Sequence, residues 1–373
     1  MTKKLSVNLA VFAASLVFML AFMEFVVFRF VLVASDIPRL DYVNGVVRYA
    51  PGQRGVYRVK NDVKARYSIN ENGWNSRHGR YDTAKAPGKF RIAVIGDSLV
   101  EALQVDYDRS FAEKLEDRLG PERCEVYRFG IGGAPMTQYL HVLRNEVERF
   151  GPDLVVVVLV HNDFDESYTF SGGAYSSSFL KLKIAGTGGV EEIQPVKYGG
   201  QAWWFFPLRN SATFRYLRFR RKVDFVVAAK EAMFGRDKKV VYRANIRVDR
   251  IKENLPKSRI AAGYVLENIK EICGRTGSGL LVVMDGDRKS IGEVAGPAGG
   301  GAEGPLLLNE LARSVSEEKG IDFIDLHPVF DREYRERGKL FYFESDMHWN
   351  DYGHEIVAET LKEYMEKKNY GKE

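Results

Sequence analysis

The sequence predicts a three-layer α/β/α fold with a doubly wound parallel sheet, preceded by one N-terminal transmembrane helix. From residue 90 onward, short apolar runs alternate with amphipathic stretches of helical period, which is the pattern of a parallel sheet covered by helices. The run Leu154–Val160 is apolar at every position, as a strand buried on both faces requires. A separate apolar stretch near the N-terminus has the composition of a membrane span.

The apolar stretch runs from Leu5 to Ala34. Crossing about 30 Å of hydrocarbon takes about 20 helical residues, so Leu5–Met23 suffices. Lysines at positions 3 and 4 favour a cytoplasmic N-terminus, and we expect a single-pass membrane protein whose remaining chain is periplasmic or extracellular. A cleaved signal peptide, with a mature chain that begins near Asp36, is the alternative. The apolar run is long for a signal peptide and no clear small-x-small cleavage site follows it, so an uncleaved anchor is expected.

We divide the chain into three parts. Residues 1–35 form the cytoplasmic stub and anchor, and residues 36–89 form a spacer with short strands packed on the main domain. The main domain spans 90–369 and contains a long insertion at 165–256. We expect no catalytic residues in the spacer, whose segments of alternating apolar and polar residues are short.

Five strands and several helices are predicted in the main domain. The strands are Phe90–Ile95, Glu125–Phe129, Leu154–Val160, Gly279–Asp285 and Ile321–Asp325. The helices are Arg109–Leu119, Thr137–Phe150, Lys257–Gly274, Pro305–Lys319 and a last amphipathic helix after residue 353. Ligands of such sheets bind beyond the carboxyl ends of the strands, so candidate sites should follow strands.

Charge and cysteine content narrow the possible functions. The net charge of +5 comes from 55 basic and 50 acidic residues. This small and dispersed excess does not indicate a nucleic-acid-binding protein. Cys124 and Cys273 lack metal-ligand spacing. Because the predicted topology puts them on different sides of the sheet, we expect two free thiols.

Polar turns follow the first three strands, at Gly96-Asp-Ser98, Gly130-Ile-Gly-Gly133 and His161-Asn-Asp163. A serine at the end of a strand can be a nucleophile, although a polar turn is the simpler interpretation. The glycine turn has Pro135 where a dinucleotide-binding loop needs its third glycine. A full pattern at Gly299, Gly301 and Gly304 lies far from a strand and is interpreted as a flexible loop.

The three turns come together if the second, first and third strands are neighbours in that order. The backbone N–H groups of Ser98 and Gly133 and the side-chain amide of Asn162 can then converge on one oxygen. Asn-Asp is also a common turn sequence, so Asn162 alone would not indicate a site.

A general base must come from six histidines. Asp346 and His348 are two residues apart in a polar loop before the last helix, and in an extended loop both side chains point the same way. The carboxylate can then hold one imidazole nitrogen while the other faces Ser98. A charged helix-capping loop is the alternative. His327, after the fifth strand, is the second choice; the others, placed less well, are His78, His141, His161 and His354.

Taken together, Gly96-Asp-Ser98, Gly133, Asn162-Asp163 and Asp346-x-His348 resemble, in that order, the four blocks of the SGNH (GDSL) hydrolase superfamily. The resemblance implies a flavodoxin-like fold and a serine hydrolase without a cofactor or metal. It implies Ser98 as nucleophile, His348 as base, Asp346 as the residue that orients it, and Gly133 and Asn162 as oxyanion donors together with the Ser98 N–H.

The spacer is similar to that of membrane-anchored bacterial members, with Ser68-Ile-Asn70 and Gly73-Trp74 ahead of Phe90-Arg-Ile92. Two positions depart from the family pattern, because Val160 and Ala102 replace common glycines. The acid lies two residues before the histidine, a spacing similar to that of the alginate O-acetyltransferase branch.

We therefore expect a membrane-anchored serine esterase that hydrolyses an O-acyl ester, most simply O-acetyl, on an envelope or extracellular glycan. The alternatives are an O-acyltransferase that uses the same triad on a polysaccharide, and a non-catalytic glycan-binding or scaffold protein. A metallohydrolase built on His161, Asp163, Asp346 and His348 is a third. The sequence makes no prediction of oligomeric state.

The insertion contains Trp203-Trp-Phe-Phe206 and the basic, aromatic stretch Arg215–Lys222. This mixture can lie on a membrane surface or cover the active site as a lid. A solvated helix packed by its aromatic face is the alternative.

Overall fold

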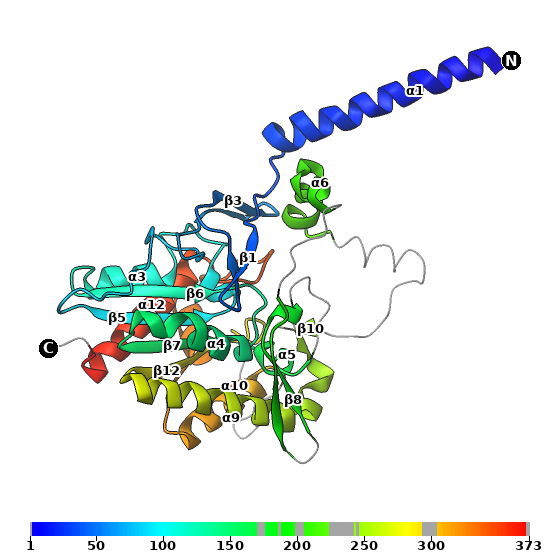
Figure 1. Ribbon diagram of the computed structural model, residues 1–373. Coiled ribbons are helices and arrows are strands. Elements are labelled where there is room, and N and C mark those ends of the chain that lie inside the picture. Colours follow the sequence, from blue (N-terminus) through cyan, green and yellow to red (C-terminus); the bar gives the residue numbers. More distant parts are fainter. Residues whose placement is uncertain are drawn as a thin grey trace.

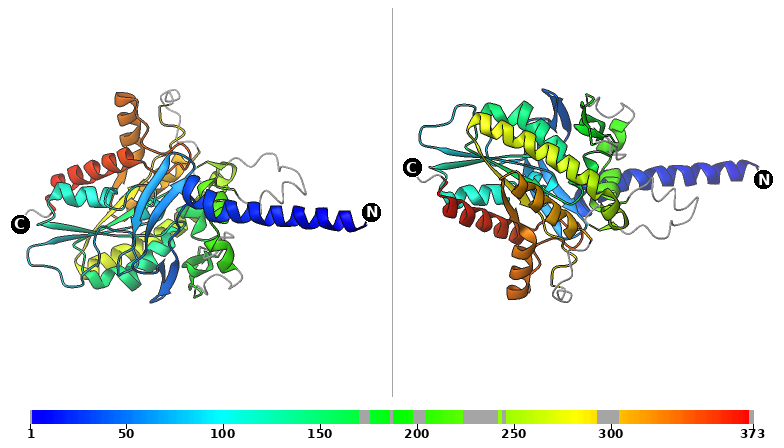
Figure 2. Two further views of the ribbon diagram at one scale, coloured as in Figure 1. Left: turned by 90° about the horizontal axis from the view of Figure 1, so that it is seen from above. Right: turned by 90° about the horizontal axis from the view of Figure 1, so that it is seen from below.

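A five-stranded parallel sheet lies at the centre of the computed structural model, with helices on both faces (Figures 1 and 2). The strand order is β13-β12-β7-β5-β6. The structure describes residues 2–169, 176–185, 188–197, 205–223, 242–243, 246–292 and 304–370. The predicted three-layer α/β/α fold with a doubly wound parallel sheet is confirmed.

The sheet strands differ from their predicted ranges by a single residue at one or both ends. They are β5 (Phe90–Gly96), β6 (Cys124–Gly130), β7 (Leu154–Leu159), β12 (Gly279–Met284) and β13 (Asp322–Asp325). Strand β5 lies between β6 and β7, where Ile95 pairs with Phe129 on one side and Val157 on the other. The second, first and third strands are therefore neighbours, as predicted.

Helices cover the two faces in two groups. One face carries α3 (Phe111–Leu119), α11 (Leu326–Arg337) and α12 (Asp351–Lys368), and the other carries α4 (Met136–Val142), α9 (Ile251–Thr276) and α10 (Leu306–Glu318). Successive residues of β5 point to opposite faces of the sheet. Ile92 and Val94 pack against the first group of helices, and Ala93 and Ile95 pack against the second. All residues of β7 are buried, which explains why this strand is apolar throughout.

Helix α11 is absent from the predicted elements. Asp325 caps its N-terminus by accepting a hydrogen bond from the His327 N–H, 3.0 Å away. Pro328 falls in the first turn, where its missing N–H costs no helical hydrogen bond. The proline thus lies at the one part of a helix that tolerates it.

Shorter elements complete the main domain. They are α2 (Ser98–Glu101), the π-helical and 3₁₀ continuation of α4 in η2 (Leu143–Val147) and η3 (Glu148–Phe150), and α5 (Asp163–Glu166). The insertion adds η4 (Ser176–Ser178), the hairpin β8 (Lys181–Ile184) and β9 (Val190–Ile193), α6 (Phe205–Asn210), α7 (Ala212–Arg215), η5 (Tyr216–Arg220), β10 (Tyr242–Arg243), β11 (Ile246–Arg247) and η6 (Val248–Arg250). Trp203, Trp204, Gly299 and Gly301 lie outside the described residues.

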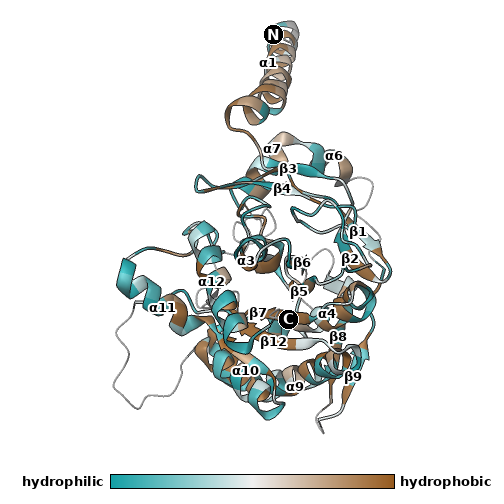
Figure 3. Cartoon of the chain, turned by 90° about the vertical axis from the view of Figure 1, so that its left-hand side faces the viewer, coloured by the Kyte–Doolittle hydropathy of each residue, from teal (hydrophilic) through white to brown (hydrophobic). Residues whose placement is uncertain are grey.

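The N-terminal helix projects away from the sheet domain (Figure 1). It comprises α1 (Thr2–Phe22) and the π-helical η1 (Met23–Val31). Lys4–Val31 is long and apolar enough to cross a membrane, with a mean hydropathy of 2.4. Most of its apolar side chains are exposed, including Phe12 at 68%, whereas Phe28 near its end is buried; Figure 3 shows the helix apolar along most of its length. The helix is a candidate membrane span by length and composition.

The spacer forms two hairpins packed on the sheet domain. They are β1 (Leu40–Val43) with β2 (Val46–Tyr49), and β3 (Arg54–Val59) with β4 (Val63–Ser68). Trp74 is fully buried and stacks edge-on against Phe129 of β6, with ring centroids 5.3 Å apart. Such burial of a large aromatic side chain stabilises the contact by about 2 to 3 kcal/mol.

Cys124 and Cys273 are both buried and free. Burial raises the pKa of each thiol to about 12. The prediction of two free thiols is confirmed.

Candidate active site

Ser98 lies at a sharp turn between β5 and α2. The strand ends at Gly96, where a β-carbon would collide with the side chain of Val100. Asp97 caps α2, because its carboxylate accepts a hydrogen bond from the Leu99 N–H at 2.9 Å. The turn leaves Ser98 half-buried at the carboxyl edge of the sheet, with its Oγ 3.1 Å from Asp97 Oδ2.

His348 faces Ser98 from the loop before α12. The imidazole Nε2 lies 2.8 Å from Ser98 Oγ. On the other side of the ring, Nδ1 lies 3.0 Å from both the backbone oxygen and carboxylate Oδ2 of Asp346. The serine, histidine and aspartate that the sequence singled out are thus in one line of contacts, the arrangement in which imidazole can take a proton from a hydroxyl.

The loop reaches this geometry differently from the prediction. It is a turn rather than an extended segment, because the N–H groups of Asp346 and Met347 both point to the carbonyl of Phe343. Met347 has a φ of +64°, a left-handed conformation uncommon outside glycine. The left-handed turn at Met347, rather than the alternation of an extended strand, therefore brings the side chains of Asp346 and His348 together.

Asp346 is held as a carboxylate. Its side chain is only 3% exposed, and burial by itself would raise its pKa. The hydrogen bond and charge of His348 and the Lys222 ammonium, 2.7 Å from Oδ1, outweigh burial and hold the pKa of Asp346 well below its usual range. The Asp346 backbone oxygen and the ionised carboxylate beside it both face Nδ1 as acceptors, which places the ring proton on Nδ1 and leaves Nε2 as the acceptor.

A cavity of about 260 Å³ opens above Ser98. It is bounded by the ends of three sheet strands and the His348 loop, and is lined by Asp97, Ser98, Leu99, Val160, His161, Asn162, Asp285, Asp287, Arg288, Lys289, Asp346, Met347 and His348. Its polar side chains lie at the edge where ligands of doubly wound sheets bind. The site predicted from the ends of strands is therefore a hollow in the structure.

The three predicted oxyanion donors are not equally placed. Asn162 is buried and lines the cavity, and its amide hydrogen-bonds Glu166, one helical turn further along the chain. Ser98 is the first residue of α2, so its N–H has no partner within the helix. Gly133 lies in the exposed turn after β6 with a φ of +74° and is not among the residues that line the cavity.

Glu101 stabilises the glycine turn beside Ser98, a role that the sequence did not indicate. Its buried carboxylate accepts hydrogen bonds from the Gly132 N–H at 2.9 Å and from the hydroxyl of Tyr49 in the spacer. Burial raises the pKa of Glu101 to about 7, against the lowering effect of these hydrogen bonds. The position of Glu101, three residues after the serine, is visible in the sequence, but its partner Tyr49 is brought there only by the fold.

Another wall of the cavity comes from residues that follow β12, and these residues are absent from the predicted site. Asp285 accepts a hydrogen bond from the Trp349 ring N–H at 3.0 Å and pairs with Arg288 at 2.6 Å. Lys289, next along, is exposed at the rim of the cavity. The signal that could have identified this wall is a charged run directly after a predicted strand.

The other histidines have structural partners or lie away from Ser98. His78 pairs with Glu116, and His141 contacts the carbonyl of Gly45. His354 is buried and accepts a hydrogen bond from the Phe111 N–H. His327 is in α11 and does not line the cavity. His161 does line it, but its Nε2 lies 2.9 Å from Asn309 Oδ1.

Three residues of the metallohydrolase alternative, His161, Asp346 and His348, line the cavity, but Asp163 does not. The carboxylate of Asp163 is buried and accepts hydrogen bonds from the Tyr139 hydroxyl and the Val160 N–H. Among the described residues, no group of three or more His, Cys, Asp or Glu side chains is arranged to hold a metal ion.

The two departures from the glycine pattern have different consequences. Ala102 ends α2 with a φ of +51°, so alanine occupies a left-handed position that glycine would adopt without strain. Its side chain is buried and the turn is intact, with the Ala102 N–H bonded to the Ser98 carbonyl. Val160 instead adds a side chain to the wall of the cavity.

Several solved structures are similar to the chain. They include a lipolytic G-D-S-L family protein from Veillonella parvula (12% identity, 74% of this chain, 99% of the other, TM-score 0.38). Others are an acetyl xylan esterase (12%, 74% and 99%, TM-score 0.40) and a two-domain esterase active on acetylated mannans (11%, 75% and 50%, TM-score 0.40). No curated protein sequence matches the chain.

The sequence profile of one family covers more than half of the chain. The GDSL-like lipase/acylhydrolase family matches residues 94–356, from β5 into the last helix. The chain therefore belongs to the GDSL-like lipase/acylhydrolase family, whose members are serine ester hydrolases.

Proposed function

We propose that the protein is a serine esterase that hydrolyses a short O-acyl ester, O-acetyl in the simplest case, through an acyl-Ser98 intermediate. The observation that carries the proposal is the 2.8 Å contact between Ser98 Oγ and His348 Nε2, with Asp346 on the far side of the ring. A hydroxyl is a weak nucleophile on its own and needs a base in contact with it.

In the first step, Ser98 Oγ attacks the ester carbonyl and its proton passes to His348 Nε2. The imidazolium is stabilised by ionised Asp346 and gives the proton to the leaving alcohol oxygen, so that the C–O bond of the ester breaks. Water then enters, His348 removes its proton, and attack on the acyl carbon releases the acid and restores the Ser98 hydroxyl.

The oxyanion of each tetrahedral intermediate is held by the Ser98 N–H and the Asn162 amide, which border the cavity. The Gly133 N–H stays a predicted third donor, since Gly133 does not line the cavity. Asn162 is buried beside Ser98, and its hydrogen bond to Glu166 limits its rotation. Removing one such donor typically costs about 3 kcal/mol of transition-state stabilisation.

The cavity favours a small acyl group and a polar alcohol. At about 260 Å³ it lies below the roughly 300 to 1,000 Å³ usual for small-molecule sites. Its walls carry the charged groups of Asp285, Asp287 and Arg288, with Lys289 at the rim. Hydroxyl-rich glycans offer matching donors and acceptors, so we propose an acylated envelope or extracellular glycan as substrate.

The N-terminal helix is the proposed membrane anchor, with a cytoplasmic N-terminus and the catalytic domain on the opposite side. Its support is the apolar, exposed surface of Lys4–Val31. N-terminal sequencing of protein extracted from membranes tests this directly. Recovery of residues 1–35 supports the anchor, whereas a mature chain that starts near Asp36 contradicts it.

The function is tested by labelling with a fluorophosphonate, which reacts with activated serines. Wild type should be labelled and S98A should not, while both retain the same melting temperature. Folded wild-type protein without label would favour the non-catalytic scaffold. Incubation with an activated acetyl ester and a panel of glycans then separates hydrolysis, which releases acetate alone, from transfer, which acetylates the glycan.

A further inference from the structure

Lys222 contacts the carboxylate of the candidate triad from a segment that has no part in the sheet. Its Nζ lies 2.7 Å from Asp346 Oδ1, and this carboxylate is the one that also faces His348. The Lys222 side chain is 43% exposed, whereas that of Asp346 is 3% exposed. A half-exposed cation therefore reaches an almost fully buried anion at the centre of the site.

The backbone at Lys222 is also unusual. It has a φ of +58° and directly follows Arg221, the residue that ends the helix η5. Glycine is the residue most often found at such a left-handed position after a helix, because it has no β-carbon. The chain thus places a lysine where a glycine would be less strained, and the side chain makes the contact with Asp346.

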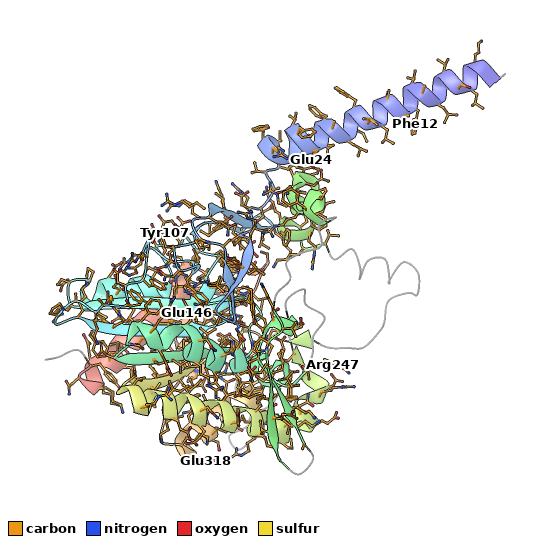
Figure 4. All side chains as sticks on the ribbon, in the orientation of Figure 1. Phe12, Glu24, Tyr107, Glu146, Arg247 and Glu318 are labelled. Carbon is orange, nitrogen blue, oxygen red and sulfur yellow. The ribbon has the colours of Figure 1, made fainter. Side chains whose placement is uncertain are left out.

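The segment that carries Lys222, residues 205–223, is attached to the base of the N-terminal helix. Glu24 caps α7, since its carboxylate accepts hydrogen bonds from the Ser211 hydroxyl at 2.8 Å and from the N–H groups of Ala212 and Thr213 at 2.7 and 2.9 Å. Figure 3 shows α6 and α7 near the lower end of that helix, and Figure 4 labels Glu24 at this end.

Further contacts bind the same segment to the chain that leaves the helix. The rings of Phe28 and Tyr216 lie 4.7 Å apart between centroids, and Arg215 pairs with Asp36 at 2.8 Å. Arg220 donates to the carbonyl of Val33 at 2.6 Å. The segment is therefore fixed to the membrane-proximal end of the chain over most of its length.

The β3–β4 turn joins this attachment to the His348 loop. The Lys60 N–H donates to the Arg220 carbonyl, and two residues further on Asp62 accepts hydrogen bonds from the backbone N–H and hydroxyl of Ser345. Ser345 immediately precedes Asp346. The loop that presents Asp346 and His348 thus receives two contacts from the membrane-proximal part of the chain, through Asp62 and through Lys222.

We propose that Lys222 is a positioning residue of the active site, presented by a segment that is fixed in place by the base of the N-terminal helix. It holds Asp346 against His348 and offsets part of its negative charge, so that membrane-proximal contacts set the reactivity of the triad. This inference rests on the proposed function, because it assumes that Ser98, His348 and Asp346 react together.

The charge has a predictable effect on pH dependence. Groups around the imidazole are Asp97 from the β5–α2 turn, Glu101 at the end of α2 and His354 from α12. His161 after β7 and Asp285, Asp287 and Arg288 after β12 line the same cavity. The last pair is Asp346 with Lys222. Only the last pair changes when Lys222 is neutralised. The negative charge of Asp346 beside the ring is then less compensated, so the acidic limb of the rate moves to higher pH.

The test measures kcat and KM for an activated acetyl ester against pH, with the full chain in detergent. We expect K222Q to move the acidic limb of kcat/KM upward by about half a pH unit and to lower the rate at pH 6 severalfold, at unchanged KM for a small ester. K222R should restore both. R221Q, which removes a neighbouring exposed charge, serves as the matched control and should behave as wild type.

The attachment is tested with E24A, which removes all three hydrogen bonds to α7. E24A should shift the profile in the same direction as K222Q, and it should add no further shift in the K222Q background. Additive shifts, or a wild-type profile for E24A, would contradict the coupling. A wild-type profile for K222Q, or a K222R profile that equals K222Q, would overturn the role of Lys222.

The same experiment separates this inference from the proposed function. S98A is measured alongside, and it should be inactive. If S98A is inactive while K222Q is indistinguishable from wild type, only the inference about Lys222 fails. If S98A retains the wild-type rate, the proposed function itself fails.

Discussion

The imidazole Nε2 of His348 lies 2.8 Å from the hydroxyl oxygen of Ser98, although the two residues are 250 positions apart in the chain. Ser98 is fixed by the turn between β5 and α2, and His348 by a loop anchored to the sheet through Trp349 and Asp285. Two rigid supports thus hold the pair together, as a proton transfer between them requires.

Substitution of His348 by alanine should reduce kcat by on the order of a thousandfold or more, because Ser98 loses its base. Asp346→Asn should also reduce kcat strongly, since asparagine cannot stabilise the imidazolium. Because the pKa of Asp346 is held well below its usual range, the Asp346 carboxyl stays ionised and contributes no limb to the pH profile at pH 5 to 9. Steady-state kinetics across that range check the losses of kcat and the shape of the pH profile. An H348A rate near that of wild type would contradict the role of His348 as the base.

Asn162→Ala should lower kcat by about a hundredfold to a thousandfold and leave KM nearly unchanged. The amide acts on charge that develops only in the transition state, so ground-state binding is little affected. Glu166→Gln is the companion variant, because it keeps the side-chain shape but weakens the hydrogen bond that orients Asn162. An N162A enzyme that changes KM alone would assign Asn162 to substrate binding.

Glu101 should make folding stability depend on pH. Its pKa is about 7 in the folded protein against 4.5 for an unburied glutamate, because burial disfavours the charged form. A raised carboxyl pKa means that the folded state holds the proton more tightly. The contribution of Glu101 to the free energy of unfolding is therefore fully present below pH 4.5. It declines by on the order of 3 kcal/mol as the pH rises through about 7.

Denaturant unfolding of wild type and Glu101→Gln at pH 5 and pH 8 isolates this group from other titrating residues. The loss of stability between the two pH values should be smaller in E101Q. Equal losses in the two proteins would mean that Glu101 is ionised in the folded state at both pH values.

Val160 should limit the length of the acyl chain. Its side chain lines the cavity where the family pattern has glycine, and it is 6% exposed. Val160→Ala should raise kcat/KM for butyrate relative to acetate esters and should destabilise the fold by about 1 to 3 kcal/mol, since it removes two buried carbons. An unchanged ratio of kcat/KM between butyrate and acetate esters would mean that the acyl group does not contact Val160.

Much of the sheet is predictable from local pattern, because buried parallel strands are continuous apolar runs with polar turns after them. For the same reason the sequence alone places Ser98 and Asn162 at the sheet edge. His348 can be chosen among six histidines because a carboxylate lies two residues before it. Ser98 and His348 are indeed in contact.

What the sequence does not show depends on contacts between distant segments. Lys222 and Asp346 are brought together by an insertion whose path no periodicity encodes. Met347 adopts a left-handed conformation that its residue type does not favour, so its turn could not be distinguished from an extended loop. Helix α11 carries Pro328, which usually ends a helical pattern, although the first helical turn accepts proline.

The most direct test of the mechanism is the capture of the acyl-enzyme. Acid quenching during the first turnovers with an activated acetyl ester, followed by peptide mass spectrometry, should find the acetyl group on the peptide that carries Ser98, and none in S98A. An acetyl group on another residue, or turnover without any acylated peptide in the presence of an initial burst of alcohol, would contradict the account.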